Sequence, residues 1–140
     1  MFNVLVSTVI VKNNKVLMVK EIKEEVKGLL NFPAGRLEKG ETLIQGALRE
    51  IKEETGFDAE ITHLIDIKYF TKKEIDCVAF VFQGKLVNNQ NALNSELECN
   101  FYDIEYLKSN LNILRNEKLI ISALNKINKG NSEVINIFNS

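Results

Sequence analysis

Several residue types are scarce in this sequence, and each shortage disfavours a class of protein. The 140 residues include one proline, one histidine, two cysteines and no tryptophan. Two cysteines, Cys77 and Cys99, are too few for a disulfide-rich secreted fold, and we expect both to be reduced core residues. A zinc site is also disfavoured, because zinc is usually bound by cysteine and histidine and the sequence has only one histidine besides the two cysteines.

Charge of one sign and long hydrophobic runs are lacking as well. The 18 basic and 19 acidic residues give a formal net charge of -1, which provides no electrostatic attraction to nucleic acid or to an anionic membrane. No apolar run approaches the roughly 18 residues that cross a bilayer, and the apolar start lacks a basic leader. We therefore expect a cytoplasmic protein without nucleic-acid or membrane partners. Its length fits a single domain, residues 1–140.

Hydrophobic periodicity predicts an α+β fold. Runs rich in β-branched and aromatic residues predict strands at residues 4–11, 15–20, 29–33, 58–71, 74–87 and 101–102. The first two flank Asn13 and Asn14, which have the composition of a hairpin turn, so we expect them to pair antiparallel. Helical spacing predicts helices at residues 42–55 and 114–129. Residues 88–95 are asparagine-rich and predict a loop, and the apolar residues of the 131–140 tail fit an edge strand or a contact with a second subunit.

The first predicted helix carries an unusual group of acids. Glu50, Glu53 and Glu54 stand at positions i, i+3 and i+4, so three carboxylates share one face. Like charges at this spacing repel, and the helix dipole disfavours acids in the last turn before Gly56. A bound cation would remove both penalties. Carboxylates without histidine or cysteine suit Mg²⁺ or Mn²⁺, and Mg²⁺ usually accompanies phosphate.

The residues around these acids follow a longer pattern. Gly35 is followed after five residues by Glu41, and after seven more by the run from Arg49 to Phe57. Residues 35–57 are similar at every defined position to the Nudix box of the MutT-like Nudix hydrolases. The resemblance implies an α/β/α sandwich with a mixed β-sheet and a loop-helix-loop catalytic motif. It also implies hydrolysis of a diphosphate bond by attack of water on phosphorus, with Mg²⁺ or Mn²⁺ as cofactor.

The resemblance assigns roles to individual residues of the box. The implied metal ligands are Glu53, Glu54 and the backbone carbonyl of Ala34, and Glu50 is implied to be a further ligand or a group that orients the water. Arg49 is implied to hold a carboxylate in a fixed orientation, as its planar fork allows.

The glycines and the first glutamate of the box have expected structural roles. Gly35, Gly40 and Gly56 are expected to adopt positive φ or to allow close backbone approach. Glu41 lies at the start of the helix, where a carboxylate can satisfy free backbone N–H groups.

The general base and the substrate contacts are less defined by the pattern. In this family the base is either a helix glutamate, here Glu53 or Glu50, or an acid from a later loop. Glu96 and Glu98 occupy that later region, and the spacing to the following aromatic pair favours Glu98. Phe101 fits a core aromatic or a ring that stacks on a base. Arg36, in the motif loop, is the best placed of several cations that could contact substrate phosphates.

The substrate is narrowed by missing subgroup markers. The only proline, Pro33, precedes the box, so the later proline of many ADP-ribose hydrolases is absent, and Tyr69 comes too early for the dinucleoside polyphosphate pattern. The chain resembles small Nudix phosphatases that act on thiamine-precursor pyrophosphates and nucleoside di- and triphosphates. Hydrolysis of oxidised nucleotides and a non-catalytic nucleotide sensor remain alternatives. We expect a monomer or a homodimer.

Overall fold

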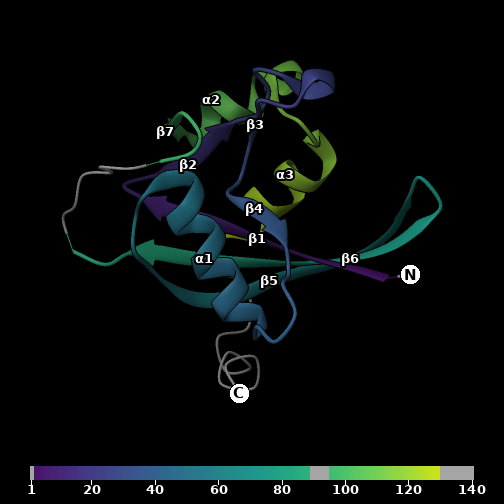
Figure 1. Cartoon of the computed structure of the whole chain (residues 1–140). Helices are drawn as coiled ribbons and strands as arrows, with labels where there is room; N and C mark the ends of the chain where they lie inside the picture. The colour runs from purple at the N-terminus through teal and green to yellow at the C-terminus, as the bar shows by residue number, and fades with distance from the viewer. Residues whose placement is uncertain (1, 89–94, 130–140) are drawn as a thin grey trace.

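The computed structural model describes residues 2–88 and 95–129. Its strands are β1 (Phe2–Lys12), β2 (Lys15–Lys20), β3 (Leu30–Asn31), β4 (Ala34–Arg36), β5 (Ala59–Lys72), β6 (Ile75–Leu86) and β7 (Cys99–Asp103), shown in Figure 1. Its α-helices are α1 (Leu43–Thr55), α2 (Ile104–Lys108) and α3 (Glu117–Leu124), and two short 3-10 helices are η1 (Glu24–Val26) and η2 (Leu111–Ile113). The mixture of strands and helices confirms the α+β prediction.

The strands form one mixed sheet with β1 at its centre. The order is β3-β2-β1-β6-β5, with β4 also paired to β1 and β7 also paired to β2. β1 runs parallel to β6 but antiparallel to β2 and β4. β5 and β6 form a long antiparallel hairpin whose tip projects from the body of the molecule (Figure 1).

Two hairpin turns depend on residues with positive φ. Asn13 and Asn14 have φ of 52° and 61°, which confirms the predicted turn and the antiparallel pairing of β1 with β2. Lys73 and Glu74 adopt φ of 50° and 65° between β5 and β6, although neither residue type favours this region. The long ladder on both sides of the second turn imposes that conformation.

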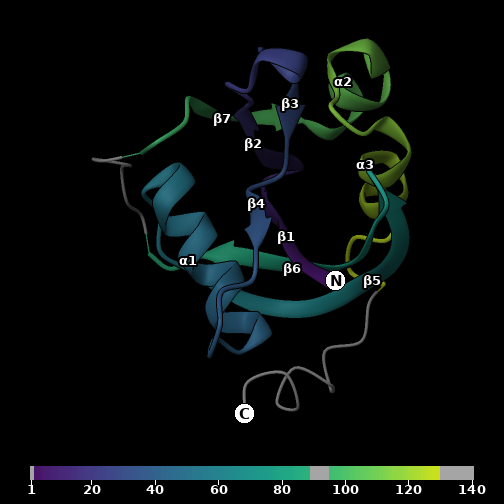
Figure 2. The same ribbon diagram turned by 45° about the vertical axis from the view of Figure 1, so that its right-hand side comes forward.

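Helices cover both faces of the sheet. Buried residues of α1 pack with one cluster from the sheet, whose members are Val6, Ile10, Leu17, Ile61 and Phe82. Buried residues of α3 pack with a second cluster, which includes Val9, Val16, Met18, Phe32, Ile65 and Val81. Figure 2 shows α1 and α3 on opposite sides of the strands. This arrangement confirms the predicted sandwich.

The second predicted helix is shorter than its hydrophobic spacing indicated. Leu114 forms a parallel bridge with Leu30, and Asn116 caps the helix by accepting from the Leu119 N–H at 3.4 Å, so α3 begins only at Glu117. After Leu124 the chain continues in turns to Lys129 rather than as helix. The predicted helix over residues 114–129 was wrong at both ends. Leu114 pairs with Leu30 before the helix, and residues 125–129 form turns after it.

One strand and one α-helix were not predicted, and neither were the two short 3-10 helices. β4 lies in what we expected to be the motif loop, because residues 34–36 pair with β1, with Val6 opposite Gly35. α2 is a five-residue helix directly after β7. The predictions for residues 89–94 and 131–140 lie outside the described residues, and a single domain over residues 1–140 stays a prediction.

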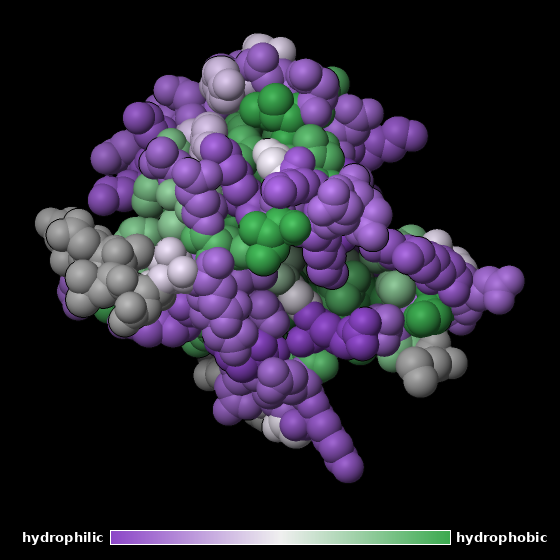
Figure 3. All heavy atoms as spheres, turned by 45° about the horizontal axis from the view of Figure 1, so that its top comes forward, coloured by the Kyte–Doolittle hydropathy of each residue, from purple (hydrophilic) through white to green (hydrophobic). Residues whose placement is uncertain are grey.

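The described surface and cysteines agree with an ordinary globular protein. Figure 3 shows one face, on which hydrophilic residues dominate and hydrophobic ones form separate patches. Cys77 and Cys99 are both free, as expected. Within residues 2–88 and 95–129, no helix is long and apolar enough to cross a membrane.

Candidate active site

Local sequence signals fix the position of α1. The Thr42 side chain accepts from the Gln45 N–H at 3.1 Å, and the Gln45 side chain accepts from the Thr42 N–H at 2.9 Å, which forms a capping box. The helix ends at Gly56, whose φ of 78° confirms the predicted terminator, and the Gly56 N–H donates to the Lys52 carbonyl at 2.9 Å. Ile44, Ala47 and Ile51 are buried. The acid face is therefore held at the edge of the core.

Arg49 connects three parts of the box through its guanidinium. Its Nε donates to Glu41 Oε2 at 2.6 Å and its Nη2 donates to Glu41 Oε1 at 3.0 Å. Its Nη1 donates to Glu50 Oε1 at 2.7 Å, and Nη2 also donates to the Arg36 carbonyl at 3.1 Å. The hydrogen bond to Glu41 is the main cause that raises the pKa of Arg49 above its usual value. Arg49 thus contacts Glu41, Glu50 and the β4 backbone at once, and its orienting role stays a prediction.

Glu41 has a different partner from the one we expected. Its carboxylate accepts from the backbone N–H of Glu38 at 2.8 Å and from Arg49, while Thr42 caps the helix instead. The expectation that Glu41 satisfies helix N–H groups was wrong, because it precedes the cap residue and turns back toward the loop. The hydrogen bond from Arg49 lowers the pKa of Glu41.

The Glu50 carboxyl group lies directly against the backbone of Gly35. A Cβ at residue 35 would coincide with the Glu50 carboxyl group, so only glycine leaves room for it. The Glu50 side chain is 12% exposed, and burial raises its pKa although Arg49 opposes the shift. The expected close approach at Gly35 is confirmed, as is the positive φ of Gly40, at 87°.

Glu54 is half-buried and points at β4. Its Oε1 accepts from the Ala34 backbone N–H at 2.9 Å. Burial raises the pKa of Glu54 to about 8, and the charges of Glu50, Glu21 and Glu96 add to this effect. A carboxyl group in this position is poorly suited to carry its charge without a cation nearby.

Glu53 is the most open of the three helix acids. Its side chain is 42% exposed and lies 3.4 Å from Arg49 Nη1. The three acids thus share one face but contact different protein groups, Arg49 for Glu50 and Glu53, and Ala34 for Glu54. Accordingly, no three histidine, cysteine, aspartate or glutamate side chains in residues 2–88 and 95–129 are grouped as a ready metal site.

The segment before β7 docks on the end of α1. The backbone N–H groups of Glu96 and Leu97 donate to the carbonyls of Glu53 and Glu54, at 2.9 and 3.3 Å. These bonds satisfy carbonyls that a helix end leaves free. The Glu98 carboxylate forms an ion pair with Lys20 at 2.9 Å and does not contact the helix acids.

The two predicted substrate contacts lie at different depths. Phe101 is half-buried on β7, with its ring centroid 6.3 Å from that of Phe57 and with Lys12 Nζ 5.9 Å from its own centroid. Phe101 thus packs against the core cluster below α1, and base stacking stays a prediction. Arg36 is exposed on β4, where its carbonyl contacts Arg49.

Sequence reasoning missed a polar cluster beside the helix acids. Glu21, in a charged stretch of residues 21–27 that is typical of a solvated face, accepts from Arg115 Nη1 at 2.9 Å and from Asn31 Nδ2 at 3.4 Å. Arg115 is 94 positions further along the chain, so no local pattern indicated this pair.

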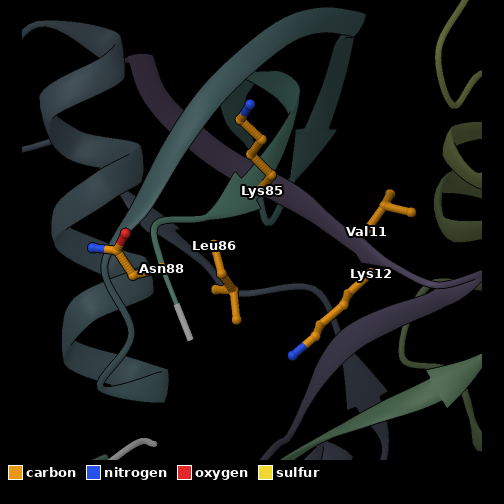
Figure 4. A pocket seen from close by; sticks show the side chains of 5 residues that line it. All are labelled: Val11, Lys12, Lys85, Leu86 and Asn88. Atoms are coloured by element: carbon orange, nitrogen blue, oxygen red, sulfur yellow. The ribbon is translucent and has the colours of Figure 1, made fainter. Parts of the chain in front are cut away.

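A hollow of about 520 Å³ lies at the carboxyl ends of β1 and β6. It is lined by Val11, Lys12, Lys85, Leu86 and Asn88. Figure 4 shows the Lys12 and Lys85 side chains extending in different directions, so their charges do not converge on one point. We assign this hollow no ligand.

Comparisons with known proteins agree with the fold and the box. The model of the NUDIX domain matches residues 1–121, and the chain therefore belongs to the Nudix hydrolase family. Its α+β fold is shared with a NUDIX hydrolase from Nitrosomonas europaea, with a TM-score of 0.82, 28% identity and coverage of 92% of this chain and 90% of the other. The structure of a UDP-X diphosphatase is similar with a TM-score of 0.73 and 26% identity. The match covers 92% of this chain and 64% of the diphosphatase chain.

Curated relatives are named hydrolases and phosphatases. The 8-oxo-dGDP phosphatase of Mus musculus is 32% identical over 96 residues, which are 65% of this chain and 29% of the relative. The ADP-ribose pyrophosphatase of Methanocaldococcus jannaschii is 30% identical over 109 residues, 74% of this chain and 63% of the relative. The chain thus spans less than two thirds of the length of either relative.

Proposed function

We propose that this protein is a divalent-metal-dependent hydrolase. It cleaves the phosphoanhydride bond of a nucleoside di- or triphosphate or of another pyrophosphate metabolite, with water attacking phosphorus. The observation that carries this proposal is the placement of Glu50, Glu53 and Glu54 on one face of α1, against the β4 backbone at Ala34.

The residues present fit Mg²⁺ or Mn²⁺. All the available donors are oxygen atoms, as these ions prefer. Glu54 lies half-buried among other carboxylates, and a cation would relieve their mutual repulsion. Ala34 is part of β4, where it is paired with Ser7 of β1. Its backbone N–H donates to Glu54 and therefore faces α1. Because the N–H and C=O of a strand residue point to the same side, the Ala34 carbonyl points with its N–H toward α1.

These residues divide into ligands and orienting groups. Glu50, Glu53, Glu54 and the Ala34 carbonyl would hold the ion, which supplies charge neutralisation for the phosphates and an activated water. Arg49 holds Glu50 in one orientation, and Gly35 leaves space for it. Among the predicted bases, Glu98 pairs with Lys20 on the loop before β7, whereas Glu53 stands on the acid face of α1 beside Glu50 and Glu54, which supports Glu53 as the group that takes the proton of the attacking water.

The substrate class rests on the relatives and on the missing markers. The names 8-oxo-dGDP phosphatase, ADP-ribose pyrophosphatase and UDP-X diphosphatase all describe nucleoside diphosphates or their derivatives. The proline expected of many ADP-ribose hydrolases is absent after the box. We therefore propose nucleoside diphosphates, including oxidised ones, ahead of ADP-ribose, and thiamine-precursor pyrophosphates as the competing substrate class.

A hydrolysis screen tests this proposal. Wild-type protein is incubated with Mg²⁺ or Mn²⁺ and with oxidised and ordinary nucleoside di- and triphosphates, ADP-ribose, UDP-sugars and thiamine-precursor pyrophosphates, and phosphate and pyrophosphate are measured separately. Glu53→Gln should lose turnover while keeping its fold, and Glu74→Gln, at the exposed β5–β6 turn, is the matched control. Unchanged turnover in Glu53→Gln would disprove the site. Tight nucleotide binding without any product would favour the sensor.

The remaining expectations are proposals of the same kind. We propose that the protein is cytoplasmic, is a monomer or a homodimer, and has no nucleic-acid or membrane partner. The balanced charge supports the last point, because phosphate-backbone binding depends on clustered basic residues.

A further inference from the structure

A polar cluster outside the Nudix box joins the end of β2 to the segment before α3. Glu21 directly follows β2, and its carboxylate accepts from Arg115 Nη1 at 2.9 Å and from Asn31 Nδ2 at 3.4 Å. The Arg115 backbone N–H donates to the Leu30 carbonyl at 2.9 Å, so this residue is itself anchored to β3. The side chains of Glu21 and Arg115 are 11% and 24% exposed. The pair is therefore fixed in place and partly open to a ligand.

Backbone contacts place this cluster close to the helix acids. The Leu97 N–H donates to the Glu54 carbonyl at 3.3 Å. One residue later, the Glu98 carbonyl accepts from the N–H of Lys20, the residue before Glu21, at 2.9 Å. The segment before β7 thus contacts the end of α1 and the end of β2 in direct succession.

A second connection runs through the segment from β3 to β4. Asn31 contacts the Glu21 carboxylate, and three positions later the Ala34 N–H donates to the Glu54 carboxylate at 2.9 Å. An extended chain rises about 3.3 Å per residue, so these two contacts are within about 10 Å of each other along the segment. The cluster is therefore close enough to the helix acids to contact the group attached to a diphosphate bound there.

The chemistry of the cluster suits an uncharged ligand group. The ion pair at 2.9 Å leaves the cluster close to neutral, so it offers little attraction to a phosphate or a metal ion. Arg115 donates to Glu21 through Nη1, and its Nε and Nη2 have no contact within residues 2–88 and 95–129. The two Glu21 oxygens can each accept a further hydrogen bond. A free donor thus stands beside a free acceptor.

We propose that Glu21 and Arg115 select substrates whose base carries a lactam edge, in which an N–H donor stands next to a carbonyl acceptor. Arg115 donates to the carbonyl, and Glu21 accepts from the N–H. Guanine, hypoxanthine and uracil carry this edge, and oxidation at C8 gives guanine a second one, whereas adenine and cytosine present an acceptor nitrogen beside an amino group. This inference rests on the proposed function, because it assumes that the helix acids hold the diphosphate of a nucleotide.

The competing view is that the pair only joins β2 to the segment before α3. Inosine diphosphate and adenosine diphosphate separate the two views, because their bases differ only in this edge. Adenine would set an acceptor nitrogen against the Glu21 carboxylate, which is also an acceptor, so it is rejected. A structural pair predicts equal losses of kcat/KM for both nucleotides when the pair is broken. A specificity pair predicts a preference that disappears with Arg115.

The experiment compares kcat/KM for the two nucleotides with Mg²⁺ in wild type and in Arg115→Met, which removes the donors but keeps a long side chain. We expect wild type to prefer inosine diphosphate by about tenfold or more, and Arg115→Met to lower this preference to about threefold or less. Arg115→Lys keeps a donor and should retain part of the preference. Lys118→Met, an exposed cation in α3, is the matched control and should keep the wild-type ratio.

Two results would overturn this inference. One is equal kcat/KM for the two nucleotides in wild type, which needs no variant and decides the matter if Arg115→Met does not fold. The other is an unchanged ratio in folded Arg115→Met.

Calorimetric binding to Glu53→Gln distinguishes failure of the inference from failure of the proposed function. This variant should lose turnover and still bind inosine diphosphate more tightly than adenosine diphosphate. Equal binding of both nucleotides would refute the role of Glu21 and Arg115, even if wild type hydrolyses neither. Retained turnover in Glu53→Gln would refute the proposed catalytic site instead.

Discussion

The raised pKa of Glu54 predicts that removing its charge stabilises the metal-free protein. The folded state raises this pKa from 4.5 to about 8, so the folded protein holds the proton more tightly than the unfolded chain does. Stability from this group is therefore present at low pH and is lost as the pH rises from about 4.5 to about 8. Glu54→Gln removes the charge and keeps an oxygen that can accept from the Ala34 N–H.

The size of the effect follows from the two pKa values. At about 1.4 kcal/mol per pKa unit, ionised Glu54 lowers the free energy of unfolding by up to about 5 kcal/mol above pH 8. At pH 7, where Glu54 is mostly protonated in the folded protein, the loss is up to about 3 kcal/mol. Some burial cost remains for the glutamine amide. We expect Glu54→Gln to unfold with a free energy about 1–3 kcal/mol higher than wild type at pH 8.5, and with a difference below about 1 kcal/mol at pH 5.

Urea unfolding in EDTA at pH 5, 7 and 8.5 measures this difference. Glu53→Gln is the control, since Glu53 is 42% exposed, and it should stay within about 0.5 kcal/mol of wild type. Equal stability of Glu54→Gln and wild type at pH 8.5, or a difference that does not change with pH, would refute the reasoning. Mg²⁺ should shrink the advantage of the variant, because a ligand at 100 times its Kd stabilises wild type by about 2.7 kcal/mol and the variant binds it less well.

Three further substitutions test other parts of the site. Gly35→Ala should displace the Glu50 carboxyl group and lower kcat/KM by about 100-fold, while circular dichroism shows a retained fold. Arg49→Lys cannot bind Glu41 and Glu50 through one planar fork, and we expect a loss of about 1–3 kcal/mol in urea unfolding together with lower kcat; unchanged stability and kcat would contradict the orienting role. Thr42→Ala removes the capping box and should cost about 0.5–2 kcal/mol without changing kcat, and a thermal melt beside the activity assay checks this.

The helix and the box were readable from sequence because their determinants are local. The Gly56 terminator and the i, i+3, i+4 spacing of Glu50, Glu53 and Glu54 lie within one turn or two of the residues they affect, whereas the capping role of Thr42 was not predicted. The hairpin at Asn13 was readable for the same reason, since a two-residue turn selects residues that tolerate positive φ. The family pattern then extended these local signals to the sandwich fold.

Contacts between distant segments were decided only by the tertiary structure. β4 exists because β1 lies beside residues 34–36, and α3 starts late because Leu114 pairs with Leu30. The partner of Glu41 is Arg49 rather than the helix N-terminus.

The electrostatics of the site has the same origin. Glu21 contacts Arg115 and Asn31, which lie 94 and 10 positions away in the sequence, so only the fold brings these partners to it. The sequence by itself determined which carboxylates share one face of α1, because their spacing along the helix is enough to put them there. Which carboxylates are buried, bound or open to solvent depends on what the other strands bring to them, and only the folded chain decides that.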